Sequence, residues 1–228
     1  MTATPQIDVA PSAEVRARQS RGTSNDAILK MVVGALDQRK IGGHCIADVG
    51  CGRGDLYNFL HPRFERYVGI DVVRYEGFPE GAEFCRLDLD SGNLPLPEGS
   101  ADVVAAVEVI EHLENPRDFM RKLARLVKPG GWVVVTTPNQ LSWLSLLTLV
   151  VKHRFQAFQD VHYPTHLTAL LEVDLRRAAA QAGLTRIDIE FSEQGRIPLT
   201  ARHFPRALSR RFPRRFSENV LVIGQKPA

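Results

Sequence analysis

The feature that most constrains the fold is a short apolar run that ends in an acidic residue and leads directly into three glycines. Residues 46–54 read Ile-Ala-Asp-Val-Gly-Cys-Gly-Arg-Gly, so the glycines alternate with other residues. A second apolar run, residues 67–71, ends at Asp71, 21 residues after Gly50. Glycines at the corner between a strand and a helix let the backbone approach a ligand closely, because no Cβ stands in the way. The two runs therefore predict neighbouring strands of an α/β fold with a binding site at their ends.

The chemistry of this corner favours one kind of adenosine ligand. An acid about 20 residues after the first glycine, at the tip of the neighbouring strand, can accept both ribose hydroxyls. The glycines form G-x-G-x-G rather than the G-x-G-x-x-G of dinucleotide sites. Asp48 and Asp55 flank them and would repel a pyrophosphate but attract an ammonium and a sulfonium. The corner thus favours S-adenosylmethionine over a nicotinamide cofactor.

The rest of the chain alternates strand-like and helix-like segments. Strands are expected at residues 45–49, 67–71, 84–89, 102–109, 132–136, 184–191 and 219–224, and helices at residues 24–40, 115–127 and 168–182, with a short one from residue 56. No full helix is expected at residues 72–81, a short crossover that contains Pro79. Alternating strands and helices predict an α/β fold with a parallel sheet, to which the last strand can add in the antiparallel direction.

Composition limits the class of protein. The chain has 228 residues, 44% of them hydrophobic, which is enough for one domain with a sizeable core. Residues 1–21 contain no apolar leader, and the apolar run at 141–151 is too short to span a bilayer. Three cysteines with no C-x-x-C pair suit a reducing compartment. We expect a cytoplasmic protein with a disordered tail at residues 1–22 and one domain at residues 23–228.

Several short blocks, taken together, carry a family resemblance. They are residues 48–54, Ile70-Asp71, residues 94–97 before 101–104, and Glu108-Val109-Ile110-Glu111-His112-Leu113 with residues 126–131 and 137–139. In this order the chain resembles the class I S-adenosylmethionine-dependent methyltransferases, and is most similar to their ubiquinone-biosynthesis O-methyltransferase branch. The resemblance implies a Rossmann-like three-layer sandwich with a seven-stranded sheet in the order 3-2-1-4-5-7-6, strand 7 being antiparallel.

The resemblance also implies a set of cofactor-binding residues. Asp48 and Gly50 would meet the methionine amino group, and Asp71 would hold the ribose hydroxyls. The remaining members of the implied set are Cys51, Gly52 and Gly54 in the loop, Val72, Asp88 and Leu89 around the adenine with Asp90 as a rival for Asp88, and Val107 and Glu108 beside the methionine moiety.

Methyl transfer to a hydroxyl also needs a base that removes the acceptor proton. His112 follows the fourth strand at the edge where ligands bind, so we expect it to be the base, with His162 and His166 as other candidates. The alternative is that His112 only orders its loop. His166 stands four residues after His162, but Pro164 between them should prevent a helix that aligns the two rings, so they are expected to orient substrate or close a lid.

A metal is a second possibility at the same place. Glu108, Glu111 and His112 resemble the divalent-metal motif of some ubiquinone-type O-methyltransferases, which implies Mg²⁺ that would lower the pKa of an acceptor hydroxyl. The same spacing also occurs where the three residues have only a structural role.

Two segments stand out as candidates for acceptor recognition. Residues 139–165 form a long connection whose apolar part, 141–151, could roof an apolar acceptor, touch a membrane surface, contact a second subunit in a homodimer, or pack as a core helix. Residues 194–228 contain eight Lys or Arg and one acid, and arginine alternates with phenylalanine over residues 202–215. This basic strip could bind an anionic or lipid-linked substrate or RNA, or be a solvated loop.

The residues therefore predict S-adenosylmethionine-dependent methyl transfer to a hydroxyl of a small or lipid-like acceptor. The alternatives are an N- or C-methyltransferase of similar fold, a methyltransferase that modifies RNA, and a scaffold that binds the cofactor without catalysis. A nucleic-acid substrate is not favoured, because the sequence shows no separate RNA-binding module.

Overall fold

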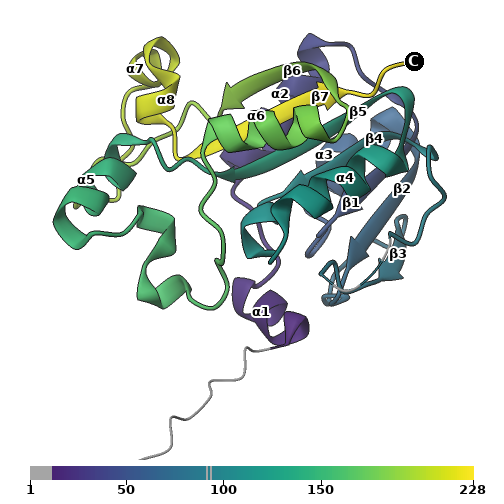
Figure 1. The fold of residues 1–228 in the computed structure, drawn as a ribbon, viewed down its shortest axis with the longest axis horizontal. Helices are drawn as coiled ribbons and strands as arrows, with labels where there is room; N and C mark the ends of the chain where they lie inside the picture. Colours follow the sequence, from purple (N-terminus) through teal and green to yellow (C-terminus); the bar gives the residue numbers. More distant parts are fainter. Residues whose placement is uncertain (1–11, 91, 93) are drawn as a thin grey trace, which may run out of the picture.

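The computed structural model describes residues 12–90, 92 and 94–228 as helices packed on both faces of one sheet (Figure 1). Its seven strands are β1 Gly43–Val49, β2 Phe64–Asp71, β3 Glu83–Arg86, β4 Ala101–Val107, β5 Val127–Pro138, β6 Thr185–Phe191 and β7 Asn219–Gln225. They lie in the order β3-β2-β1-β4-β5-β7-β6, and β7 runs antiparallel to both of its neighbours whereas the other pairs are parallel. This topology confirms the predicted fold class.

The core consists of two hydrophobic layers, one on each face of the sheet. The α-helices are α1 Ala13–Ser20, α2 Asp26–Gln38, α3 Tyr57–Leu60, α4 Pro116–Leu126, α5 Trp143–Lys152, α6 Glu172–Gln181, α7 Arg206–Arg211 and α8 Pro213–Phe216, and the 3-10 turns are η1 His61–Arg63, η2 Ile110–His112, η3 Gln156–Phe158 and η4 Asp160–His162. Side chains of α4 and α6 pack on one face, and those of α2 and α3 on the other (Figure 1). Covered on both faces, the central strands are apolar almost throughout.

Helix α4 shows how local sequence sets an element boundary. The Asn115 side chain accepts a hydrogen bond from the backbone N–H of Asp118 at 3.1 Å, and Pro116 occupies the first helical position. Phe119, Met120 and Leu123 then fall at helical spacing and are buried against the sheet. The predicted start and buried stripe of this helix are confirmed.

The predicted disorder of residues 1–22 is wrong for residues 13–20, which form helix α1; residues 1–11 lie outside the described part of the chain. Helix α1 has no apolar stripe in its sequence, and it buries no side chain completely. It is held by polar contacts: Tyr75 donates a hydrogen bond to the Ala17 carbonyl at 2.5 Å, and Arg16 pairs with Asp90 at 2.8 Å. Such contacts leave no periodic signal in a sequence.

Two other boundaries differ from the prediction. Strand β4 ends at Val107 rather than residue 109, because Glu108 adopts a left-handed backbone with φ of 55°. The helix predicted from Thr168 begins only at Glu172. The backbone N–H groups of Leu167 and Thr168 instead donate to the Glu111 carbonyl at 2.8 and 3.0 Å. Both differences bring residues from distant parts of the chain to one edge of the sheet.

Helices α5, α7 and α8 lie together at one end of the long axis of the molecule (Figure 1). Arg215 of α8 donates a hydrogen bond at 3.3 Å to the backbone carbonyl of Leu141, just before α5. Among the described residues, no helix has the length and apolar content needed to cross a bilayer.

Replacing Asn115 with alanine should destabilise the protein by about 1 kcal/mol, because the Asp118 N–H loses its acceptor at the start of α4. Asn115→Asp is the matched control, since its carboxylate can accept the same bond and favours the positive end of the helix dipole. Urea unfolding followed by circular dichroism measures both variants. Equal midpoints for Asn115→Ala and the original protein would show that the cap contributes nothing.

Candidate functional site

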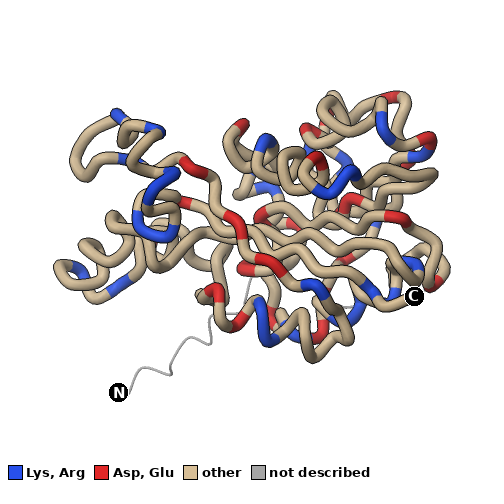
Figure 2. Tube along the Cα trace, turned by 90° about the horizontal axis from the view of Figure 1, so that it is seen from above, with Lys and Arg blue, Asp and Glu red and all other residues tan. Residues whose placement is uncertain are grey.

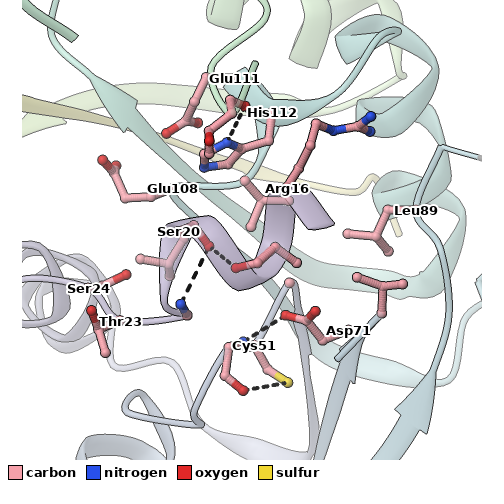
Figure 3. Close-up of a pocket in the computed structure, with 18 of the residues that line it drawn as sticks. Arg16, Ser20, Thr23, Ser24, Cys51, Asp71, Leu89, Glu108, Glu111 and His112 are labelled. Carbon is pink, nitrogen blue, oxygen red and sulfur yellow. Dashed lines mark hydrogen bonds between the residues drawn. The ribbon is translucent and has the colours of Figure 1, made fainter. Parts of the chain in front are cut away.

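A cavity of about 400 Å³ opens at the carboxyl ends of β1, β2 and β4 (Figure 3). Ten of the eleven predicted cofactor residues line it: Asp48, Gly50, Cys51, Gly52, Asp71, Val72, Asp88, Leu89, Val107 and Glu108. Both predicted catalytic histidines, His112 and His166, line the same cavity. Residues that sequence reasoning placed in separate segments therefore share one pocket. The exception is Gly54, which does not line it.

The glycine loop owes its composition to packing as much as to ligand approach. Gly50 has φ of 77°, and a Cβ there would lie 2.3 Å from the Val109 side chain. A Cβ on Gly52 would lie 2.3 Å from the Gly22 carbonyl oxygen, which accepts a hydrogen bond from the Arg53 N–H at 2.8 Å. The loop therefore lies in close contact with Val109, just before η2, and with Gly22, just after α1, so only glycine fits at positions 50 and 52.

Asp71 fixes the geometry of this loop from the end of β2. Its two carboxylate oxygens accept hydrogen bonds from the backbone N–H groups of Gly52 at 2.9 Å and Val73 at 3.1 Å (Figure 3). Burial raises the pKa of Asp71, and these two bonds oppose that rise. Each oxygen keeps a second lone pair, so the carboxylate can also accept two hydroxyl groups of a ligand.

Asp48 lies at the end of β1 as a buried acid in an acidic surrounding. Tyr67 donates a hydrogen bond to its carboxylate. Burial, together with the nearby negative charges of Asp71 and Asp55, raises the pKa of Asp48 to about 7. A cation bound beside it would remove this penalty, because opposite charge favours the ionised form. The site thus suits a positively charged ligand group and disfavours a phosphate.

The loop after β3 brings both rival acids to the pocket. Asp90 is engaged on both oxygens, with Arg16 at 2.8 Å and with the backbone N–H of Glu114 at 3.0 Å. Asp88 accepts a hydrogen bond from the Asp90 N–H at 3.1 Å. Asp90 therefore links helix α1 to the segment before α4, and both acids line the pocket.

Glu108 lines the pocket, but its carboxylate is held by neighbouring strands. One oxygen accepts from the Thr136 hydroxyl at 2.9 Å, and the other accepts from the Asn219 side-chain amide at 2.8 Å. Burial and the nearby Glu111 raise the pKa of Glu108 well above its ordinary value. Glu108 is not among the side chains whose ligand atoms gather within 4.8 Å, which are those of Glu111, His112 and His166. The resemblance grouped Glu108 with Glu111 and His112 as metal ligands, and the structure does not bring Glu108 into that group.

His112 is held in one tautomer. Its Nδ1 lies 2.7 Å from the Thr165 backbone carbonyl, which can only accept, so Nδ1 carries the proton and Nε2 has a lone pair. Burial lowers the pKa of His112, so the ring is neutral at pH 7. A neutral imidazole with a bare nitrogen in the pocket can accept a proton from a ligand.

His166 has the same arrangement and meets His112 edge-on. Its Nδ1 donates to the Ala157 carbonyl at 2.7 Å, and the two ring centroids are 4.7 Å apart at 75°. Burial and the neighbouring His112 lower the pKa of His166 to about 4. His162 stacks on His166 with centroids 5.5 Å apart and 19° between the rings. No helix spans Pro164, as predicted, but a single turn from the His162 carbonyl to the His166 N–H still brings the two rings together.

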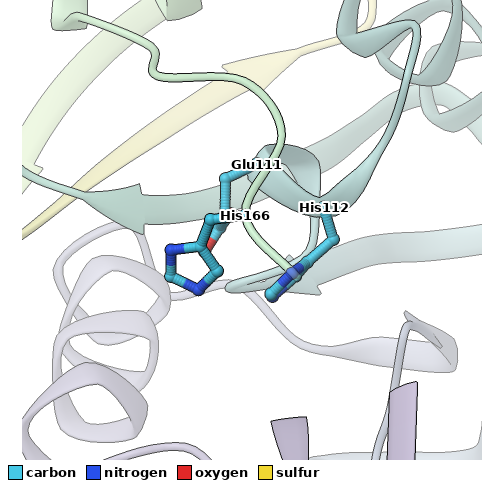
Figure 4. A group of neighbouring side chains, drawn as sticks. All are labelled: Glu111, His112 and His166. Atoms are coloured by element: carbon cyan, nitrogen blue, oxygen red, sulfur yellow. The ribbon is translucent and has the colours of Figure 1, made fainter. Parts of the chain in front are cut away.

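Glu111, His112 and His166 form a compact cluster (Figure 4). One ligand atom from each lies within 4.8 Å of the others. Glu111 is buried, accepts a hydrogen bond from the Thr137 hydroxyl at 3.1 Å, and has its pKa raised to about 8 by burial. Within the described residues, Glu111 and His112 of η2, the turn after β4, thus meet His166, which follows η4.

Helix α1 is the part of the site that sequence reasoning missed. Arg16 and Ser20 of this helix line the pocket opposite Asp71 and His112 (Figure 3). The sequence signal for this helix was weak: it is one serine, Ser12, before a run of good helix formers. In the structure Ser12 does cap the helix, accepting a hydrogen bond from the Val15 N–H at 3.4 Å.

Curated relatives match a part of the chain. A Mycolicibacterium smegmatis protein named as an S-adenosylmethionine-dependent methyltransferase is 34% identical over 104 residues, covering 44% of this chain and 40% of its own length. The ubiquinone biosynthesis O-methyltransferase of Albidiferax ferrireducens is 32% identical over 121 residues, covering 48% of this chain and 47% of its own length. The chain thus spans less than half the length of these curated relatives.

The fold is shared more widely than the sequence. An S-adenosylmethionine-dependent methyltransferase from Archaeoglobus fulgidus superposes with a TM-score of 0.62 over 94% of this chain and 100% of its own, at 19% identity. The family model described as "Methyltransferase domain" matches residues 21–189, which include every predicted cofactor and catalytic residue. With the pocket, the strand order and this match in agreement, the chain belongs to the methyltransferase domain family.

Proposed function

We propose that this protein transfers the methyl group of S-adenosylmethionine to a hydroxyl oxygen of a small or lipid-like acceptor. One observation carries the hydroxyl assignment: a neutral His112, with a bare Nε2, faces the pocket that holds the predicted cofactor residues. A hydroxyl oxygen becomes a strong nucleophile only as its proton is removed, so it needs such a base, whereas a neutral amine can attack the methyl group before it loses a proton. The relative named as a ubiquinone biosynthesis O-methyltransferase agrees with this assignment.

The acidic corner fits the proposed methyl donor. S-adenosylmethionine supplies a methyl group on a positively charged sulfur and also carries an ammonium group and a ribose. Asp48, buried beside Asp71, is the group that a cation would stabilise. Asp71 has lone pairs left for the two ribose hydroxyls. Val107 and Glu108, at the end of β4, would lie beside the amino-acid part of the donor.

The protein's own groups supply proton removal and positioning. The acceptor hydroxyl would give its proton to Nε2 of His112 as the oxygen attacks the methyl carbon. The resulting imidazolium is stabilised by its Nδ1–H, because the bond to the Thr165 carbonyl strengthens when the ring is charged. His166 packs edge-on against His112 and fixes the orientation of the base. Positioning supplies the rest of the acceleration, since the reaction needs oxygen, carbon and sulfur in line.

The direct test measures transfer of labelled methyl from S-adenosylmethionine to a panel of phenols, isoprenoid-substituted phenols and amines. We expect labelled ethers from the phenols. Methylated amines with no ether product would overturn the hydroxyl assignment.

Asp71→Ala should weaken the binding of S-adenosylhomocysteine by about 1–3 kcal/mol, because the ribose hydroxyls lose a charged acceptor. Asp26→Ala is the matched control, since Asp26 is an exposed acid paired with Lys30 on α2. Isothermal titration calorimetry gives both affinities. An unchanged affinity in Asp71→Ala would remove Asp71 from the ribose site.

The affinity for S-adenosylhomocysteine should rise with pH and level off above about pH 7. Asp48 is protonated below its raised pKa, and binding of the ligand ammonium favours the ionised carboxylate, so binding below pH 7 must first release a proton. Calorimetry at pH 6 and pH 8, in buffers of different ionisation enthalpy, measures the affinity and the proton release. Asp48→Asn should abolish this pH dependence. A flat profile in the original protein would contradict the assignment.

His112→Gln should lower turnover by about 10²–10⁴-fold while leaving cofactor affinity nearly unchanged, because it removes the base and not the cofactor contacts. In the original protein, turnover should fall in acid only below the lowered pKa of His112. His44→Gln provides the control, since His44 is exposed at the start of β1, away from the pocket. Full activity in His112→Gln would exclude His112 as the base.

A further inference from the structure

Helix α5 buries hydroxyl side chains and exposes several of its apolar ones. Its buried residues are Ser145 and Thr148, which face the protein. The Ser145 hydroxyl accepts from the Gln156 N–H at 3.2 Å, and the Thr148 hydroxyl donates to the Gln156 side chain at 3.0 Å. Ser145 and Thr148 therefore contact η3, and four apolar side chains of the helix are exposed on its other side.

The outward face of α5 is continuous and strongly apolar. Its members recur at helical spacing and are exposed by 52% at Trp143, 41% at Leu147, 74% at Val150 and 67% at Val151. A helix on the surface of a globular protein normally shows its polar side to water. Contiguous apolar surface of this kind marks a contact with a partner or a lipid phase.

Positive charge borders this apolar face. Residues 141–166 contain one Lys, one Arg and one Asp, and residues 194–217 contain seven Arg and no acid. Figure 2 shows Lys and Arg segments at the end of the molecule where Figure 1 places α5, α7 and α8. Arg206 and Arg211 are exposed and form no ion pair within the described chain, and Phe212 beside them is also exposed. An apolar face bordered by arginine matches the composition of helices that lie in the headgroup region of a bilayer.

We propose that α5, with α7 and α8, docks this protein on the surface of an anionic lipid bilayer. Trp143 and the valines would enter the interface between headgroups and acyl chains, where tryptophan is favoured. Arg206 and Arg211 of α7 would contact lipid phosphates, whereas Arg210 and Arg214 already pair with Glu193 and Glu172. A second copy of this chain fits less well, because a two-fold contact through the same surface would bring the two sets of arginines together.

The segment that carries α5 also contributes residues to the pocket. Val161 of η4 lies in the same connection as α5, residues 139–165, is 83% exposed and lines the cavity that contains His112 and His166. A lipid-like acceptor that passes Val161 would thus enter the pocket beside the segment that carries α5. This link to the acceptor rests on the proposed function, whereas the docking itself does not.

The test is co-sedimentation of the full chain with vesicles of phosphatidylcholine, with and without phosphatidylglycerol. We expect binding that requires phosphatidylglycerol, weakens as salt is added, and shifts tryptophan fluorescence to the blue. A Trp143→Ser/Val150→Ser/Val151→Ser variant and an Arg206→Glu/Arg211→Glu variant should each bind at least about tenfold more weakly. The matched controls are Val173→Ser, an exposed valine on α6, and Arg121→Glu/Arg125→Glu on α4. Both controls should bind as the original protein does.

Binding of S-adenosylhomocysteine is measured in every variant, so a folding defect or a failure of the proposed function is detected separately from a docking defect. If the folded protein binds to neither kind of vesicle, the proposal is wrong. Vesicle binding that the α5 and arginine variants leave unchanged would also overturn it. A dimer in light scattering that the α5 variant dissociates, without vesicle binding, would assign this face to a second copy instead.

Discussion

The structure of the pocket depends on two carboxylates buried where β1 and β2 end. Asp71 organises the glycine loop through the Gly52 and Val73 N–H groups, and Asp48 lies beside it at the end of the neighbouring strand. Two acids this close and this buried repel each other, so an unliganded pocket holds unfavourable charge at its base. A cationic ligand removes that repulsion. Under the proposed function, selectivity for a positively charged nucleoside would come from these two strand ends.

The sequence was most informative where function and local backbone coincide. Asp71 and the glycines were found because strand, turn and acid occur within one short stretch, and the strand order followed from the family resemblance. Gly54 shows the limit of such reasoning: a Cβ there would lie 2.6 Å from Pro79, so this glycine is needed for packing and not for the pocket. A motif marks the position of a loop but does not say what each glycine contacts.

The acceptor side was less predictable because its geometry comes from distant contacts. Helix α1 carries no apolar stripe, and it meets the pocket through a carbonyl of Ala17 and the Arg16 side chain. The pairing of His112 with His166 depends on how residues after η4 fold back to the Glu111 carbonyl. Spacing alone could not show that the Glu108 carboxylate is held by Thr136 and Asn219, because these partners come from β5 and β7.

Both histidine tautomers are set by main-chain oxygens, those of Thr165 and Ala157. Main-chain carbonyls are present whatever side chain a residue carries. Substitutions of side chains in this stretch can therefore change the lining of the pocket while the tautomer of the proposed base persists. Under the proposed function, substitutions in this loop could therefore change which acceptor is bound while the two histidines keep their tautomers. A change of substrate would then not require a loss of activity on the way.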